Sequence, residues 1–222
     1  MVLVDSIVFL RSETGDNKFK WLQRIVDKIY DVTGLAVSAV ALGGASFSGK
    51  LTYQEMLRYV FEQYKFEWTF KFLFVISMGN DIYVKGPDSD GNTKIPYELA
   101  DCAEMGIRDF LRVARNQFDV IGLVFGGSSY VWQYSGEKGH VYDRLVDYVL
   151  WSLIKHRFQY GLDYVSSGAR ELGTLSKDDI VDSIGHLHAR AYPKLETAVV
   201  SWIRELMKQN PYPWYRGMSS KL

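Results

Sequence analysis

Residues 35–57, LAVSAVALGGASFSGKLTYQEML, join an apolar run, a pair of glycines and an amphipathic segment. The run at 35–42 has the length and composition of a buried β-strand, and residues 52–64 have the apolar spacing of an α-helix. A strand that passes through a glycine turn into a helix is the repeating unit of α/β proteins. This stretch therefore indicates the fold class.

The same unit recurs along the whole chain. Further strands are predicted at 2–9, 70–78, 119–127 and 158–166, and further helices at 16–33, 97–117, 138–155 and 189–208. Runs that are apolar on both faces are typical of a parallel sheet covered by helices on both sides. We expect a three-layer α/β/α sandwich that forms one domain at 1–208, followed by a C-terminal tail at 209–222.

The composition narrows the class of protein. The chain has 222 residues, of which 47% are hydrophobic, so it is long enough to bury a full core. Lys and Arg together number 26, as do Asp and Glu, so no overall charge favours nucleic acid. A lone cysteine, Cys102, is typical of an intracellular, cytoplasmic protein. No secretory signal and no transmembrane segment are predicted, and no oligomeric state follows from the sequence.

The glycine turn itself resembles a nucleotide-binding P-loop, which needs Gly, four residues, Gly-Lys and then a hydroxyl residue. Gly44, Gly49 and Lys50 satisfy the pattern. Leu51 stands at the hydroxyl position, and Thr52 comes one residue late. On a helix, one residue turns a side chain by roughly 100°, so the magnesium ligand is misplaced. A nucleotide-binding α/β protein therefore remains only a third interpretation.

Polar residues and glycines follow the predicted strands, where open α/β sheets bind their ligands. Asp5 and Ser6 come immediately after the first strand, Gly44 follows the second, and Asn80 follows the third. Asp182 and His186 come before the last predicted helix. A hydroxyl, backbone and amide donors, and a histidine beside a carboxylate are the groups that acyl transfer requires.

The order of these motifs resembles the SGNH, or GDSL-type, hydrolase family of serine esterases and lipases. VLVDSIVFLR resembles the first block of that family, with Ser6 as the nucleophile. GGAS is similar to the second block, with Gly44 as a backbone donor, and VISMGND to the third, with Asn80 as a side-chain donor. HLHARAYPKLETAV resembles the stretch after the catalytic histidine, which indicates His186 rather than His188.

This resemblance implies a flavodoxin-like sheet and a serine hydrolase that cleaves an acyl or acetyl ester through an acyl-enzyme intermediate. It implies a catalytic triad of Ser6, His186 and Asp182. It also implies an oxyanion hole formed by the N–H groups of Ser6 and Gly44 and the side-chain amide of Asn80. No metal or organic cofactor is implied, and the expected partner is a small-molecule or lipid ester substrate.

Two departures from the family pattern keep a second interpretation open. Val4 stands where the first block has glycine, and Asp182 is four residues before His186 instead of three. Positions three and four apart share a helical face, so Asp182 can still orient the imidazole, with Asp179 as the fallback. The alternative is a binding or scaffold domain that keeps the SGNH fold without its activity.

Overall fold

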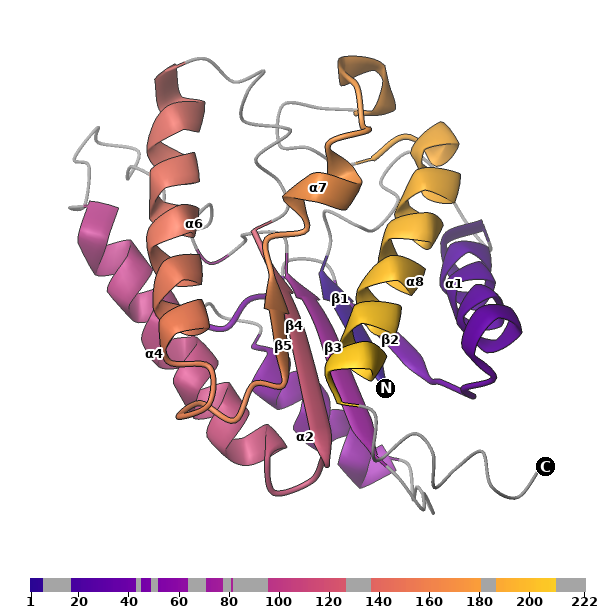
Figure 1. Cartoon of the computed structure of the whole chain (residues 1–222), viewed down its shortest axis with the longest axis horizontal. Coiled ribbons are helices and arrows are strands. Elements are labelled where there is room, and N and C mark those ends of the chain that lie inside the picture. The colour runs from indigo at the N-terminus through magenta and orange to yellow at the C-terminus, as the bar shows by residue number, and fades with distance from the viewer. Residues whose placement is uncertain are drawn as a thin grey trace.

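A parallel sheet forms the centre of the computed structural model, which describes residues 1–5, 17–42, 45–48, 52–63, 71–77, 81, 96–126, 137–180 and 187–210 (Figure 1). Its strands are β1 (Val2–Asp5), β2 (Ala39–Leu42), β3 (Phe72–Ser77), β4 (Val120–Phe125) and β5 (Tyr164–Ser166). They lie in the order β2-β1-β3-β4-β5, and every neighbouring pair is parallel. This is the flavodoxin-like order, as the resemblance implied.

Helices cover both faces of the sheet. They are α1 (Asn17–Thr33), α2 (Tyr53–Gln63), α4 (Pro96–Ala114), α6 (Glu137–Lys155), α7 (Ala169–Leu172) and α8 (Tyr192–Gln209), with short 3₁₀ turns η1 (Lys177–Asp179) and η2 (Ala189–Ala191). Helix α1 packs beside α8 on one face, and α4 packs against α2 and α6 on the other (Figure 1). The predicted three-layer α/β/α sandwich is confirmed.

The apolar runs that predicted the sheet are buried as expected. All six residues of β3 and all six of β4 are buried, because helices cover both of their faces. The strand predicted at 158–166 is shorter, since β5 begins only at Tyr164. The N–H groups of Tyr160 and Leu162 instead donate to the carbonyls of His156 and Arg157, at 3.1 and 2.8 Å, in turns that extend the end of α6.

Local sequence explains where the helices begin and end. Helix α1 ends at Gly34, which adopts a φ of 72° that is easy only for glycine and donates its N–H to Tyr30 O at 2.8 Å. Helix α2 begins with a capping box. Thr52 N–H donates to the carboxylate of Glu55 at 2.8 Å, and Glu55 N–H donates back to Thr52 Oγ1 at 3.2 Å.

The carboxyl ends of the central strands lie level with one another. Asp5 of β1 is in register with Leu42 of β2, and Ser77 of β3 with Phe125 of β4. Strand β1 lies between β2 and β3, so the chain order along the sheet reverses at β1. Ligands of open α/β sheets bind in the crevice beyond the carboxyl ends at such a reversal.

Candidate active site

The predicted nucleophile and oxyanion donors follow neighbouring strands of the sheet in the sequence. Ser6 directly follows the last residue of β1, Gly44 comes two residues after the end of β2, and Asn80 comes three residues after the end of β3. Ser6, Gly44, Asn80, Asp182 and His186 themselves lie outside the described residues. What the structure describes is the framework on either side of each of them.

A buried carboxylate joins the turn after β2 to the turn after β3. Asp81 is 1% exposed. Its Oδ1 accepts the backbone N–H groups of Phe47 and Ser48 at 2.8 and 2.7 Å, and the hydroxyl of Ser48 at 2.9 Å. Its Oδ2 lies 3.0 Å from Phe47 N. Hydrogen bonds to a carboxylate are among the stronger ones in proteins, so Asp81 clamps the two turns together.

The segment at 45–48 is also held from its other sides. Phe47 packs against the rings of Tyr53 and Phe110, with ring centroids 4.7 and 5.3 Å away. Tyr53 N–H donates to Ser46 O at 3.0 Å. On α4, a Cβ built on Gly106 would lie 2.5 Å from Phe47 O, so only glycine lets the helix approach this closely. The described part of the second block is therefore rigidly packed.

The predicted base and its orienting acid belong to a short segment that precedes α8 in the sequence. Residues 181–186, which include Asp182 and His186, lie outside the described residues, but the chain on both sides is described. Ile180 and Leu187 form an antiparallel bridge, and His188 N–H donates to Asp179 O at 2.7 Å. The described residues on the two sides of this segment are thus bonded to each other, just before α8.

Asp179, the fallback for orienting the histidine, is engaged elsewhere. It is 4% exposed, and its Oδ2 accepts the N–H and hydroxyl of Ser176 at 2.8 and 3.0 Å and the ammonium of Lys194 at 2.8 Å. Burial by itself raises the pKa of Asp179, but the hydrogen bonds from Lys194 and Ser176 outweigh it and hold the pKa below its ordinary value. Asp179 is therefore a charged capping residue that ties η1 to α8.

Two other residues that the sequence analysis considered for a functional site, His188 and Thr52, form hydrogen bonds that cap helices. The ring Nδ1 of the exposed His188 accepts Arg190 N–H at 3.3 Å and so caps η2. Thr52, the displaced hydroxyl of the P-loop interpretation, donates from Oγ1 to Glu55 at 3.0 Å within the capping box of α2. The hydroxyl of Thr52 therefore caps the first turn of α2, and this structural role explains the residue without a bound nucleotide.

Sequence reasoning missed the role of Asp81. The signal was present, because an acidic residue directly follows Asn80 at the end of a predicted strand. Its partners, Phe47 and Ser48, come 34 and 33 positions earlier in the chain. No local pattern connects those positions, so only the tertiary structure reveals the clamp.

Comparison with known proteins identifies solved structures that share the fold of this chain. No protein-family model and no curated protein matches the sequence. Among solved structures, a lipase from a goat rumen metagenome aligns with a TM-score of 0.59 and 14% identity, over 90% of this chain and 96% of its own. An acetylxylan esterase variant from Geobacillus stearothermophilus aligns with a TM-score of 0.55 and 15% identity, over 91% and 92% of the two chains.

An α/β hydrolase from the metagenome of Lake Arreo, Spain, aligns with a TM-score of 0.54 and 12% identity, over 92% of this chain and 94% of its own. In all three cases the alignment covers nearly the whole of both chains. At these identities the similarity establishes a shared fold.

Proposed function

We propose that this chain is a serine hydrolase of the SGNH type that cleaves a carboxylic ester, acyl or acetyl, through an acyl-enzyme intermediate. Ser6 is the nucleophile, His186 the general base and then acid, and Asp182 the residue that orients the imidazole. The N–H groups of Ser6 and Gly44 and the side-chain amide of Asn80 bind the oxyanion. The shared fold with esterases and a lipase supports this proposal.

The clamp made by Asp81 is the observation that carries the proposal. It binds Phe47, three residues after Gly44, and itself directly follows Asn80. The clamp therefore links the two turns that hold the proposed oxyanion donors, on the strands that flank β1 and its Ser6. Oxyanion donors must be held in place before the charge develops, since stabilisation depends on preorganisation.

The proposed chemistry has two steps. Ser6 Oγ attacks the ester carbonyl while its proton passes to His186, and the tetrahedral intermediate places its negative charge on the oxyanion donors. The C–O bond to the alcohol breaks as His186 returns the proton to the leaving oxygen. Water then attacks the acyl-enzyme, giving its proton to His186, and the acid leaves as Ser6 Oγ recovers the proton. Because Asp179 is engaged by Lys194 and Ser176, we assign the orienting role to Asp182.

Labelling with a fluorophosphonate probe tests the nucleophile directly. The wild-type chain is expected to be labelled at Ser6, and Ser6→Ala is expected to abolish the label. Ser167→Ala is a matched control, because this serine also follows a strand end, and its hydroxyl accepts Ala169 N–H at 3.1 Å. Labelling that persists in Ser6→Ala, or that never occurs while a control hydrolase reacts, would contradict the proposal.

Hydrolysis of p-nitrophenyl esters tests the oxyanion hole. Removal of one donor costs about 3 kcal/mol of transition-state stabilisation, so Asn80→Ala is expected to lower kcat about 100-fold while the fold is kept. Esters of graded chain length distinguish an acetyl esterase from a lipase-like enzyme. A normal kcat in Asn80→Ala removes this residue from the mechanism.

A catalytically impaired binding domain with the same fold is the second candidate. It is motivated by Val4, which replaces the glycine of the first block, and by the displaced Asp182. Failure of both labelling and ester hydrolysis supports this alternative. Magnesium-dependent ATP binding that is lost in Lys50→Ala would instead support nucleotide binding, although Thr52 caps α2.

A further inference from the structure

An exposed apolar stripe runs along the C-terminal half of α6. Tyr148, Trp151, Ile154 and Phe158 are 41%, 60%, 51% and 81% exposed. Tyr148, Trp151 and Ile154 are three positions apart, so they lie on one face of α6 over a length of roughly 9 Å, and Phe158 follows in the turn after the helix. Met105 on the neighbouring helix α4 is 58% exposed and extends this apolar surface. Large side chains grouped on one outer face mark an interaction site more often than single ones do.

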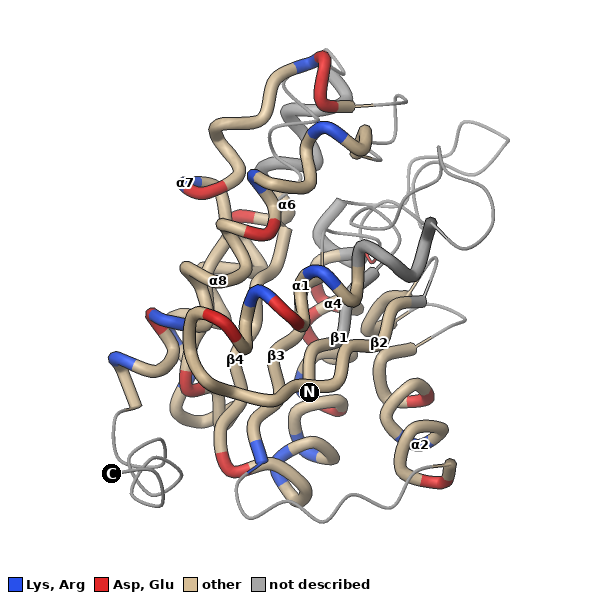
Figure 2. Tube along the Cα trace, turned by 90° about the vertical axis from the view of Figure 1, so that its right-hand side faces the viewer, with Lys and Arg blue, Asp and Glu red and all other residues tan. Residues whose placement is uncertain are grey.

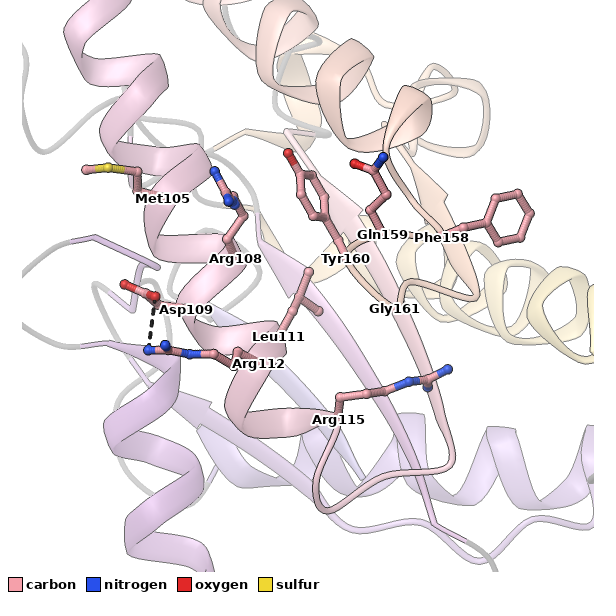
Figure 3. A pocket seen from close by; sticks show the side chains of 10 residues that line it. All are labelled: Met105, Arg108, Asp109, Leu111, Arg112, Arg115, Phe158, Gln159, Tyr160 and Gly161. Carbon is pink, nitrogen blue, oxygen red and sulfur yellow. Dashed lines mark ion pairs between the residues drawn. The ribbon is translucent and has the colours of Figure 1, made fainter.

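An open cleft lies between α4 and the turn after α6, and Phe158 is the residue of the stripe that lines it (Figure 3). The cleft has a volume of about 790 Å³, and Met105, Leu111 and Phe158 form part of its lining. Arg115 in its wall donates to Asp119 O at 3.0 Å and pairs with Asp163 at 2.9 Å. Asp119 comes directly before β4, and Asp163 comes directly before β5. The cleft therefore lies at the amino edge of the sheet, opposite the candidate active site.

Three cations on this surface lie over aromatic rings. Lys155 Nζ is 4.7 Å from the centroid of the Trp151 ring, and Arg157 Cζ is 4.6 Å from that of Phe158. Arg108 Cζ is 5.5 Å from the ring of Tyr160, whose hydroxyl donates to Glu104. Within the described part of the chain, no ion pair joins any of these cations to a carboxylate.

The remaining charges on this surface are of both signs, and Glu104, which accepts the hydroxyl of Tyr160 at 2.7 Å, lies one helical turn before Arg108. Arg112 pairs with Asp109 at 3.3 Å, so these two charges compensate each other. The exposed carboxylate of Asp101 lies two turns before Arg108 on α4, and that of Asp147 directly precedes Tyr148 near the middle of α6, two turns before Lys155. On the far face of the sheet, seen in Figure 2, basic and acidic residues are interspersed. The end of the stripe at Phe158 thus combines apolar side chains with two cations, Lys155 and Arg157, that form no ion pair with any described carboxylate.

We propose that the surface formed by Tyr148, Trp151, Ile154, Lys155, Arg157 and Phe158, together with Arg108, docks on an anionic phospholipid membrane. Aromatic and aliphatic side chains on one helical face, flanked by Lys and Arg, have the chemistry of an interfacial helix. The cations match the negative headgroups, while the rings enter the headgroup region. No described helix is long and apolar enough to cross a membrane.

Charge favours this partner over a second copy of the chain. A two-fold interface places a surface against itself, and would bring the cations of both copies together. This inference does not rest on ester hydrolysis.

Vesicle co-sedimentation of the full chain tests the proposal. We expect binding to phosphatidylcholine vesicles that contain about 30% phosphatidylserine, and much weaker binding to pure phosphatidylcholine. Binding is expected to weaken when NaCl is raised from about 0.1 to about 0.5 M, because salt screens the attraction. Lys155→Gln with Arg157→Gln is expected to weaken binding about fivefold for each charge removed.

The apolar contribution is tested by a matched pair of double variants. Trp151→Ser with Phe158→Ser is expected to weaken vesicle binding about tenfold or more. Tyr30→Ser with Tyr59→Ser removes side chains that are 50% and 62% exposed on α1 and α2, and is expected to bind as wild type. Circular dichroism and the thermal midpoint verify that all variants fold, since every substituted side chain has an exposed face.

Three results would overturn the proposal. One is the absence of binding to anionic vesicles, and another is binding that the Trp151 and Phe158 substitutions leave unchanged. The third is a dimer in sedimentation velocity that those substitutions dissociate, which would assign the stripe to contact between two copies. None of these results depends on esterase activity, so failure here is distinguishable from failure of the proposed function.

Discussion

Replacement of Asp81 measures how much the clamp between the two turns contributes. Asp81→Ala removes the acceptor for the buried N–H of Phe47 and the half-buried N–H of Ser48. Hydrogen bonds to charged groups contribute about 1.5–3 kcal/mol each, and the buried charge that is removed partly offsets this loss. We therefore expect the free energy of unfolding to fall by about 3–4 kcal/mol, which lowers Tm by about 10 °C in a chain of this size.

A graded pair of substitutions separates the clamp from a general effect of mutation. Asp81→Asn keeps one oxygen acceptor but loses the charge, so we expect about 1–2 kcal/mol of destabilisation. Asp119→Asn is the matched control. Asp119 Oδ2 also accepts a backbone N–H, from Lys71 at 2.9 Å, but it is exposed and lies at the opposite edge of the sheet. That control is expected to cost less than about 1 kcal/mol.

Urea unfolding and ester hydrolysis of the same variants provide the two measurements. If the clamp positions the oxyanion donors, Asp81→Asn lowers kcat about tenfold or more with little change in KM, because small displacements of catalytic groups are costly. Asp119→Asn leaves kcat unchanged. Equal stability of Asp81→Ala and wild type would refute the clamp itself. A destabilised but fully active Asp81→Asn would refute only its positioning role.

Three further outcomes are expected. Gly106→Ala places a Cβ 2.5 Å from Phe47 O, so differential scanning calorimetry is expected to show about 1–3 kcal/mol of destabilisation, whereas an unchanged Tm would show that α4 moves freely. Thr52→Ala removes the cap of α2 and is expected to cost about 1 kcal/mol in urea unfolding; no loss would mean that Glu55 alone suffices. The pKa of Asp179 is held below its ordinary value of 3.8, so its charge stabilises the fold above about pH 4, and this contribution is lost as the pH falls through the folded-state pKa. The difference in unfolding free energy between wild type and Asp179→Asn should therefore shrink as the pH is lowered from 6 toward 3, and a constant difference would contradict this ionisation.

Local patterns predicted most of the elements, because each pattern is short in the sequence. Helix α1 spans 17–33 where 16–33 was predicted, and α2 spans 53–63 where 52–64 was predicted. The strand predicted at 158–166 was too long, because its aromatic residues satisfy a strand pattern while their backbone donors bond within turns. Periodicity reports which side chains are apolar, and not which carbonyl accepts each N–H.

The candidate site was predicted only in part. Ordinary chain connectivity places Ser6, Gly44 and Asn80 after three neighbouring strands, as the motif order suggested. Their catalytic roles, and those of Asp182 and His186, stay predictions. Asp179 resembled a second candidate acid by sequence, yet its carboxylate is held by Lys194, 15 positions away.

The sequence by itself determined the alternation of strands and helices, because hydrophobic period and glycine or capping residues act over a few neighbouring positions. Only the tertiary structure decided that β1 lies between β2 and β3, that Asp81 binds Phe47, and that the stripe at Trp151 stays uncovered. These features depend on which distant segments pack together. That choice is made by burial and hydrogen bonding summed over the whole core, which no local stretch of residues encodes.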